Sequence, residues 1–197
     1  KLKGGISIRK YSAEPMKADF EHITCNGESV IPGTSWNGAI RADVKNILLQ
    51  LGCSTSRCEF LLNKWFGYVN VEKGSGFSRK QKPDAQQSCV VIGESIIRDT
   101  VRVPMTRNKI SRFDASTITG ALYSEVTSCG GETELEIMVK KDDLYYRALL
   151  AVLELVVQDI CKGYVAVGGQ AAVGRGIFEP RDGFEPSDGF LEEKLRK

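Results

Sequence analysis

The segment from Ile31 to Arg41 (IPGTSWNGAIR) carries the residue types that bind a phosphate group. A proline–glycine turn precedes a stretch with helical spacing, and the start of a helix has unpaired backbone N–H groups and a partial positive charge. Glycine lets a ligand approach the backbone, short polar side chains add hydrogen bonds, and an arginine sits one turn in. The candidate phosphate-binding residues are Gly33, Thr34, Ser35, Asn37 and Arg41. The alternative is an ordinary helix that Thr34 or Ser35 caps, with Trp36 in the core.

A second glycine-rich segment, from Gly168 to Gly176 (GGQAAVGRG), could curl around a ligand. It differs from a nucleotide-binding P-loop because no Lys-Ser/Thr pair follows its glycines and because it comes after the last expected helix. Its four glycines free the backbone, and Arg175 supplies positive charge. The candidate binding residues are Gly168, Gly169, Gln170 and Arg175. The alternative is a glycine-rich hairpin without a ligand.

Positive charge is concentrated between Arg98 and Arg112, where five basic residues accompany one acid, Asp99. The tail from Glu179 to Glu193 is mostly acidic, so charge is segregated along the chain. Such segregation is typical of a face that binds a polyanion. The candidate polyanion-binding residues here are Arg107, Lys109 and Arg112. A solvated edge strand protected by its charges is the alternative.

Asp19 lies in an expected loop between the first strand and the phosphate-suited helix start, with Glu21 and His22 beside it. A carboxylate in that place could bind a divalent cation next to a phosphodiester or act in acid–base chemistry. Taken alone, an aspartate in a loop is more often simply solvated.

Length and composition set the frame in which these residues must be positioned. The chain has 197 residues, with 42% apolar and 26% charged residues, which is typical of a globular domain and excludes a disordered or collagen-like chain. The net charge is only +2, so the case for nucleic-acid binding depends on the local distribution of charge. No apolar run approaches the roughly 18 residues that span a bilayer, and no signal-peptide pattern is found.

The six cysteines contain no C-x-x-C pair, and His22 is the single histidine. We therefore expect reduced, structural thiols rather than disulfides. A zinc site that includes Cys53 and Cys58 is the less favoured alternative, because it would need distant ligands. We assign no residue as a metal ligand.

Periodicity predicts a mixed α+β domain. The pattern favours strands over 3–11, 89–98, 133–139 and 164–167, helices over 36–51, 57–66 and 142–162, and a loop over 12–29. We expect one domain over 1–197, an inserted thumb hairpin within 99–131 with strands in 101–126, and a flexible basic loop over 73–87. Without the insertion, the order of elements predicts a ferredoxin-like, RNA-recognition-motif-like palm.

Four of these segments together resemble the RAMP superfamily of CRISPR-associated proteins. Residues 31–41 resemble its I-P-G-[ST]-S-x-x-G-x-x-R element, and residues 168–176 resemble its C-terminal glycine-rich loop. Residues 107–125 (RNKISRFDASTITGALYSE) resemble the segment rich in arginine, aspartate and glycine of type III backbone subunits, and Trp65-Phe66-Gly67 resembles a Leu-Phe-Gly element. The four segments occur in the family's order along nearly the whole chain.

The resemblance implies a backbone subunit of a type III CRISPR effector complex that binds CRISPR RNA and cleaves complementary target RNA in antiviral defence. Asp19 would be the catalytic residue, and a divalent cation, with Mg²⁺ expected, would be the cofactor. The implied partners are CRISPR RNA, target RNA, other effector subunits and further copies of the chain, in a prokaryotic cytoplasm.

Three alternatives stay open. The chain could be a non-catalytic structural subunit of the same complex, or a CRISPR RNA maturation endonuclease of the same superfamily that uses His22. It could also be an unrelated ferredoxin-like enzyme, although the sequence lacks a histidine–carboxylate cluster.

Overall fold

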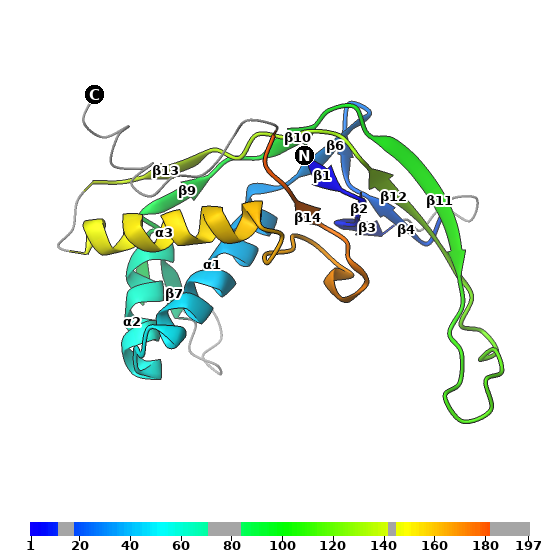
Figure 1. Ribbon diagram of the computed structural model, residues 1–197, viewed down its shortest axis with the longest axis horizontal. Coiled ribbons are helices and arrows are strands. Elements are labelled where there is room, and N and C mark those ends of the chain that lie inside the picture. Colours follow the sequence, from blue (N-terminus) through cyan, green and yellow to red (C-terminus); the bar gives the residue numbers. More distant parts are fainter. Residues whose placement is uncertain (12–17, 71–83, 142–144, 182–197) are drawn as a thin grey trace, which may run out of the picture.

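The computed structural model describes residues 1–11, 18–70, 84–141 and 145–181 and shows an α+β fold (Figure 1). The strands form a curved layer, three α-helices lie beneath one end of it, and a long hairpin projects from the other end. The helices are α1 (Gly33–Gln50), α2 (Thr55–Phe66) and α3 (Tyr146–Cys161). A single turn of 3₁₀ helix, Ala171–Val173, lies in the glycine-rich loop below the strands.

The largest sheet carries most of the candidate site. Its order is β11-β12-β4-β3, and β2 also pairs with β12. All pairs are antiparallel except β12 with β4, in which Glu125 lies opposite Phe20. Its strands are β2 (Gly5–Ile6), β3 (Arg9–Tyr11), β4 (Phe20–His22), β11 (Val101–Arg107) and β12 (Tyr123–Cys129).

The remaining strands form four smaller sheets. The pairs are β1 with β14, β13 with β9 and β7 with β8, and a three-stranded sheet has the order β10-β6-β5. Their strands are β1 (Leu2–Lys3), β5 (Thr24–Cys25), β6 (Glu28–Ile31), β7 (Tyr68–Asn70), β8 (Asp84–Gln86), β9 (Val90–Ile92), β10 (Ser95–Ile97), β13 (Ile137–Val139) and β14 (Ile177–Phe178).

The hydrophobic core lies between the three helices and the strands above them. Helix α1 buries Trp36, Ile40 and Val44 at its apolar spacing, because these positions share one face of the helix. The Trp36 ring packs on Phe178 at 5.1 Å, and its Nε1 donates a hydrogen bond to Ser95 Oγ at 3.2 Å. Helix α1 is thus fixed between β14 and β10.

The three helices confirm the sequence prediction, with shifted ends. Helix α1 begins at Gly33, so Thr34 and Ser35 lie inside it, and Pro32 precedes it without a side-chain capping bond. The predicted capping by Thr34 or Ser35 is therefore wrong. The predicted start of the last helix at residue 142 or 143 lies outside the described residues, and α3 begins at Tyr146.

The loop predicted over 12–29 is wrong where the structure describes it, because β4, β5 and the start of β6 lie there. Asn26 and Gly27 have φ of 50° and 86° and join β5 to β6 in a two-residue hairpin. Asn-Gly is the preferred pair for such a turn, since both positions need positive φ. The polar residues of β4, β5 and the start of β6 led to the prediction of a loop, although His22 and Ser29 are buried.

Five other boundaries also differ from the prediction. The strand expected over 89–98 is divided into β9 and β10, which belong to different sheets. The strand expected over 3–11 is split into three short strands, and the one expected over 133–139 is formed only at β13. The segment 164–167 makes only an isolated bridge between Ala166 and Ile177. Within the expected loop over 73–87, residues 84–86 pair with β7 as a strand, and 73–83 lie outside the described residues, as does most of the acidic tail. Such short strands are held by backbone pairing and carry too few residues for a period to be visible.

Candidate nucleic-acid interface

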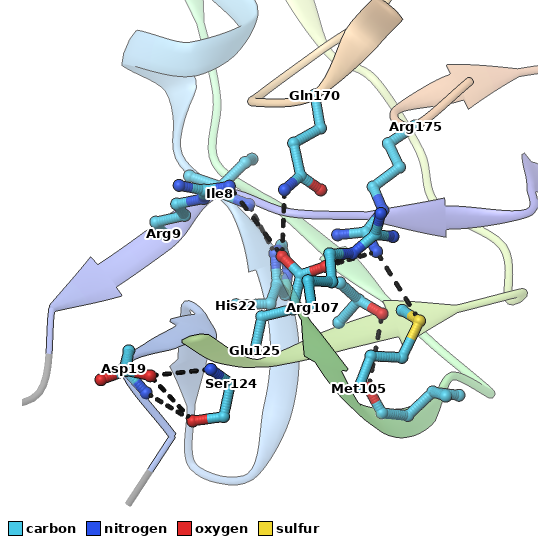
Figure 2. A network of polar contacts seen from close by, with 12 residues as sticks. Ile8, Arg9, Asp19, His22, Met105, Arg107, Ser124, Glu125, Gln170 and Arg175 are labelled. Atoms are coloured by element: carbon cyan, nitrogen blue, oxygen red, sulfur yellow. Dashed lines mark hydrogen bonds and ion pairs between the residues drawn. The ribbon is translucent and has the colours of Figure 1, made fainter. Parts of the chain in front are cut away.

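A buried carboxylate, Glu125 on β12, brings together the glycine-rich loop and the base of the projecting hairpin (Figure 2). Its side chain is 1% exposed. Arg175 Nη2 donates to Glu125 Oε1 at 2.8 Å, and Gln170 Nε2 donates to Oε2 at 3.0 Å. Arg107 Nε also donates to Oε1, and Arg9 Nη2 lies 3.9 Å from Oε2. Three predicted RNA-binding residues therefore meet at one carboxylate that the sequence analysis did not single out.

Electrostatics keep Glu125 ionised. Burial by itself raises the pKa of this carboxyl, but hydrogen bonds and positive charge from Arg175, with hydrogen bonds from Gln170 and Arg107, outweigh it and hold the pKa below its ordinary value. Three guanidinium groups surround one carboxylate, so the cluster keeps an excess of positive charge. Arg175 is itself buried, whereas the side chains of Arg9 and Arg107 are about one-third exposed, at 35% and 34%.

The glycines of the 168–176 loop allow it to press against the protein's own backbone. A Cβ atom on Gly176 would lie 1.9 Å from the Val167 carbonyl oxygen, and one on Gly168 would lie 2.9 Å from the Ser7 carbonyl oxygen. The N–H of Gly169 donates to Ser7 O and that of Gly176 donates to Gly5 O, both at 2.8 Å. The loop therefore curls around the N-terminal strand and places Gln170 and Arg175 above Glu125.

Asp19 precedes β4 and is bound to Ser124, the neighbour of Glu125 on β12. Asp19 Oδ2 accepts a hydrogen bond from the Ser124 backbone N–H at 2.7 Å and one from its hydroxyl at 3.0 Å. The backbone N–H of Ser124, followed by its hydroxyl, lowers the pKa of Asp19, so the carboxylate is ionised at neutral pH. Successive residues of a strand point to opposite faces, so the side chains of Ser124 and Glu125 lie on opposite faces of β12. The Asp19 carboxylate, which is bound to Ser124, therefore lies away from the face that carries Gln170 and Arg175.

The two neighbours of Asp19 differ in their roles. Glu21 Oε2 accepts a hydrogen bond from Arg102 Nη2 at 3.0 Å in a partly exposed ion pair. His22 is buried, and its Nδ1 accepts a hydrogen bond from the Ile8 N–H at 3.0 Å. Burial, assisted by the charge of Arg102, lowers the pKa of His22 to about 4, so the ring is neutral at pH 7.

The predicted phosphate-binding residues at the start of α1 lie apart from the Glu125 cluster. A Cβ atom on Gly33 would lie 2.3 Å from the Ile92 carbonyl oxygen, so this glycine packs against β9. Thr34 is exposed, while Ser35 and Asn37 are half-buried. Arg41 donates hydrogen bonds to Gly67 O and Asn63 Oδ1, both at 3.2 Å, and so ties α1 to the end of α2.

Lys109 and Arg112 lie beyond the paired part of β11 and β12, in the connection at the tip of the hairpin, and both are exposed. An isolated bridge joins Ile110 to Thr117 across this connection, and Phe113 is fully exposed. The tip thus presents two positive charges and an aromatic ring away from the body of the protein (Figure 1).

The residues that the structure describes contain no group of three or more His, Cys, Asp or Glu side chains that could hold a metal ion. Cys58 is buried and Cys53 lies near enough to help raise its pKa, although burial is the main cause. All six cysteines are free.

Sequence comparison decides the family. The family model of the RAMP superfamily matches residues 14–179, which is most of the chain and includes the hairpin, α1 and the glycine-rich loop. The chain belongs to the RAMP superfamily. The resemblance of the sequence to this superfamily is confirmed. No curated protein sequence matches this RAMP protein significantly.

Solved structures share the fold of this RAMP protein at low sequence identity. A chain of the Type III-B Cmr-beta cryo-EM structure in the apo state has a TM-score of 0.59 at 12% identity, and the match covers 94% of this chain and 96% of that one. A chain of Type III-B Cmr-beta bound to cognate target RNA has a TM-score of 0.54 at 11% identity, with coverage of 90% and 93%. Among the described residues of this RAMP protein, no helix has the length and apolarity that crossing a membrane would require.

Glu125 is the central residue that sequence reasoning missed. It is an acid at an inward-facing position of β12, whose alternate residue Thr127 is also buried. A carboxylate is rarely buried without a cationic partner. An acidic residue in a strand that follows a basic segment is therefore a candidate for a buried ion pair with that segment.

Proposed function

We propose that this RAMP protein is an RNA-binding backbone subunit of a type III CRISPR effector complex. The convergence of Arg107, Gln170 and Arg175 on Glu125 carries this proposal, because it joins the hairpin and the glycine-rich loop, which are far apart in sequence, into one cluster with an excess of positive charge. Its fold is shared with chains of Type III-B Cmr-beta, one of them from a structure of Type III-B Cmr-beta bound to cognate target RNA. The partners proposed are CRISPR RNA, target RNA, other effector subunits and further copies of this chain, in a prokaryotic cytoplasm.

Cleavage of target RNA is the proposed activity, with Asp19 as the catalytic residue. Asp19 is exposed and ionised, and the hydrogen bonds from Ser124 both reach Oδ2, which orients the carboxylate. Mg²⁺ commonly uses one or two carboxylates together with phosphate oxygens, so Asp19 and a phosphodiester would suffice to hold it. The bound ion would supply positive charge to the developing transition state.

The rival functions differ in the residue they need. Maturation chemistry by His22 is disfavoured, because that ring is buried and neutral. A purely structural subunit would keep the cluster of arginines around Glu125 but would leave Asp19 without a chemical role. The ferredoxin-like, RNA-recognition-like palm is proposed as the frame of either, with the β11–β12 hairpin as its thumb.

Salt-dependent RNA binding by the purified full-length protein tests the proposed function. We expect affinity for several unrelated single-stranded RNAs to be similar and to fall with salt, with a log–log slope of about −0.7 for each phosphate neutralised. Replacing Lys109 and Arg112 by alanine should weaken every RNA alike and make the slope shallower. Arg147→Ala is the matched control, because Arg147 is an exposed arginine on α3. A flat salt response, or equal loss in the control, would contradict the proposal.

A further inference from the structure

Strand β13 lies at an open edge of the strand layer. Among the described residues it has one neighbouring strand, β9, with which it pairs antiparallel. The two strands lie above α3, at the end of the layer opposite the projecting hairpin (Figure 1). An open edge presents backbone N–H and C=O groups that can bind a further strand.

The hydrogen bonds on the β9 side show which backbone groups of β13 are open. The Glu136 carbonyl oxygen accepts a hydrogen bond from that side at 3.3 Å, and the Lys140 N–H donates one to it at 2.9 Å. Backbone groups alternate in direction along an antiparallel strand, so those of Met138 also point to β9. The N–H and C=O groups of Ile137 and Val139 therefore point to the open side.

Apolar side chains lie on both faces of β13. Ile137 and Val139 pack against the hydrophobic core below, yet they stay half-buried. On the outer face Met138 lies opposite Val91, and the two residues are 51% and 50% exposed. A further strand at this edge would remove part of this apolar surface from water, which favours binding.

The charged residues around Met138 are placed symmetrically. Glu136 precedes Met138 by two residues and Lys140 follows it by two, and both are exposed on the outer face. A strand with this order is complementary to a second copy of itself that runs in the opposite direction. Each glutamate then lies opposite a lysine, and opposite charges across two strands stabilise a sheet.

We propose that β13 pairs antiparallel with β13 of a second copy of this protein, about a two-fold axis at Met138. Ile137 then lies opposite Val139 of the partner subunit, and this pair exchanges two hydrogen bonds because both residues direct their backbone groups to the open side. Glu136 lies opposite Lys140 of the partner subunit. The product is a continuous antiparallel sheet of four strands, with the two copies of β9 outermost.

The contact goes beyond the proposed function and does not depend on RNA. It uses the same strand of both copies, so it closes at a dimer and cannot extend into a filament. The projecting hairpins lie at the far ends of the two copies and stay accessible (Figure 1). A contact of this small size is typical of reversible association, so we expect a weak dimer.

Sedimentation equilibrium of the full-length protein without RNA tests the contact. We expect a monomer–dimer equilibrium in the wild type. Glu136→Lys, or Lys140→Glu, should raise the dissociation constant of the dimer by about 5- to 30-fold, because two symmetric pairs change from attraction to repulsion. The double variant with both changes should restore the dimer. Glu28→Lys is the matched control, since Glu28 is an exposed acid on β6.

Amide hydrogen exchange of the wild type needs no variant. We expect the N–H groups of Ile137 and Val139 to exchange more slowly as protein concentration rises, with less change at Met138, which is already bonded to β9. A monomer at every concentration would overturn the inference, and so would a dimer that neither single charge reversal weakens or that the double variant fails to restore. RNA binding by such a protein would leave the proposed function intact, whereas a dimer that binds no RNA would contradict the proposed function alone.

Discussion

Asp19 and Ser124 are 105 residues apart in sequence, yet one carboxylate oxygen of Asp19 accepts both the backbone N–H and the hydroxyl of Ser124. The parallel pairing of β4 with β12 makes this contact, because it places Phe20 opposite Glu125. The proposed catalytic carboxylate is thus attached to the strand that carries the buried centre of the cationic cluster. Its orientation depends on that strand.

Replacing Asp19 by alanine or asparagine should abolish target cleavage in the reconstituted complex and leave RNA affinity unchanged. We expect a loss of at least about 100-fold, the scale for a positioned acid–base or charge-stabilising group. A chelator should have the same effect on the wild type. Cleavage of a labelled complementary RNA is the measurement.

Glu21→Gln is the matched control for Asp19, because it removes a carboxylate two residues away that serves the ion pair with Arg102. We expect it to keep cleavage. His22→Ala is unsuitable as a neutral control, since His22 is buried and its removal leaves a cavity. Wild-type cleavage by Asp19→Ala would show that the catalytic assignment is wrong.

Glu125→Ala should destabilise the protein by about 3–5 kcal/mol, the usual result of removing one partner of a buried ion pair. The variant leaves the buried guanidinium of Arg175 without its counter-charge. Urea unfolding compares it with Glu59→Ala, which breaks the part-exposed Lys45–Glu59 ion pair on α1 and α2. Equal effects of the two substitutions would contradict a structural role for the cluster.

The buried histidine should make the protein less stable in acid. The pKa of His22 is about 4 in the folded protein and 6.5 as its ordinary value. Between these values the unfolded chain binds a proton that the folded chain does not, so His22 favours folding fully above pH 6.5 and loses that contribution as pH falls toward 4. We expect the free energy of unfolding to depend less steeply on pH in His22→Gln, measured by urea titration from pH 7.5 to 4.5. Parallel curves for the two proteins would refute this.

Gly176→Ala should prevent the glycine-rich loop from docking. Gly176 has φ of 70°, and a Cβ atom would lie 1.9 Å from the Val167 carbonyl oxygen. Gly174→Ala has a similar φ of 81° but meets no atom within 4 Å, so the difference between the variants isolates the collision from the backbone strain. We expect a much lower melting temperature for Gly176→Ala and weaker RNA binding. The same melting temperature in both variants would count against docking of this loop.

The sequence predicts the helices well because each buries one face of a 3.6-residue period, as Trp36, Ile40 and Val44 do. The sequence also predicts Arg107, Gln170 and Arg175 as binding residues, because each lies in a short segment whose glycine or arginine content can be recognised without knowledge of the fold. It could not bring them together, because their meeting point is set by pairing between strands distant in sequence. Asn26-Gly27 is a typical turn pair, but the strands on either side of it are short and polar. Their alternation of apolar and polar residues is therefore too weak to predict a hairpin.

The Arg41 side chain illustrates a second limit of local reasoning. Its place near a helix start suits a phosphate, but its guanidinium is within hydrogen-bond distance of Asn63 and Gly67 on the adjoining helix end. A long cationic side chain reaches several neighbours, and only packing decides which. Its proposed contact with RNA stays a prediction.

The pairing of β1 with β14 has a consequence for how the chain acquires its structure. Leu2 lies opposite Phe178, and the backbone nitrogen of Lys1 donates to the Glu179 carbonyl oxygen at 2.7 Å. During synthesis β1 therefore cannot pair with β14 until residues 177–178 have left the ribosome. Contacts between such distant segments slow folding and leave partly formed sheets open to aggregation. Nascent chains of this protein thus have a long interval in which a chaperone, or an early-binding ligand, can determine the yield of folded molecules.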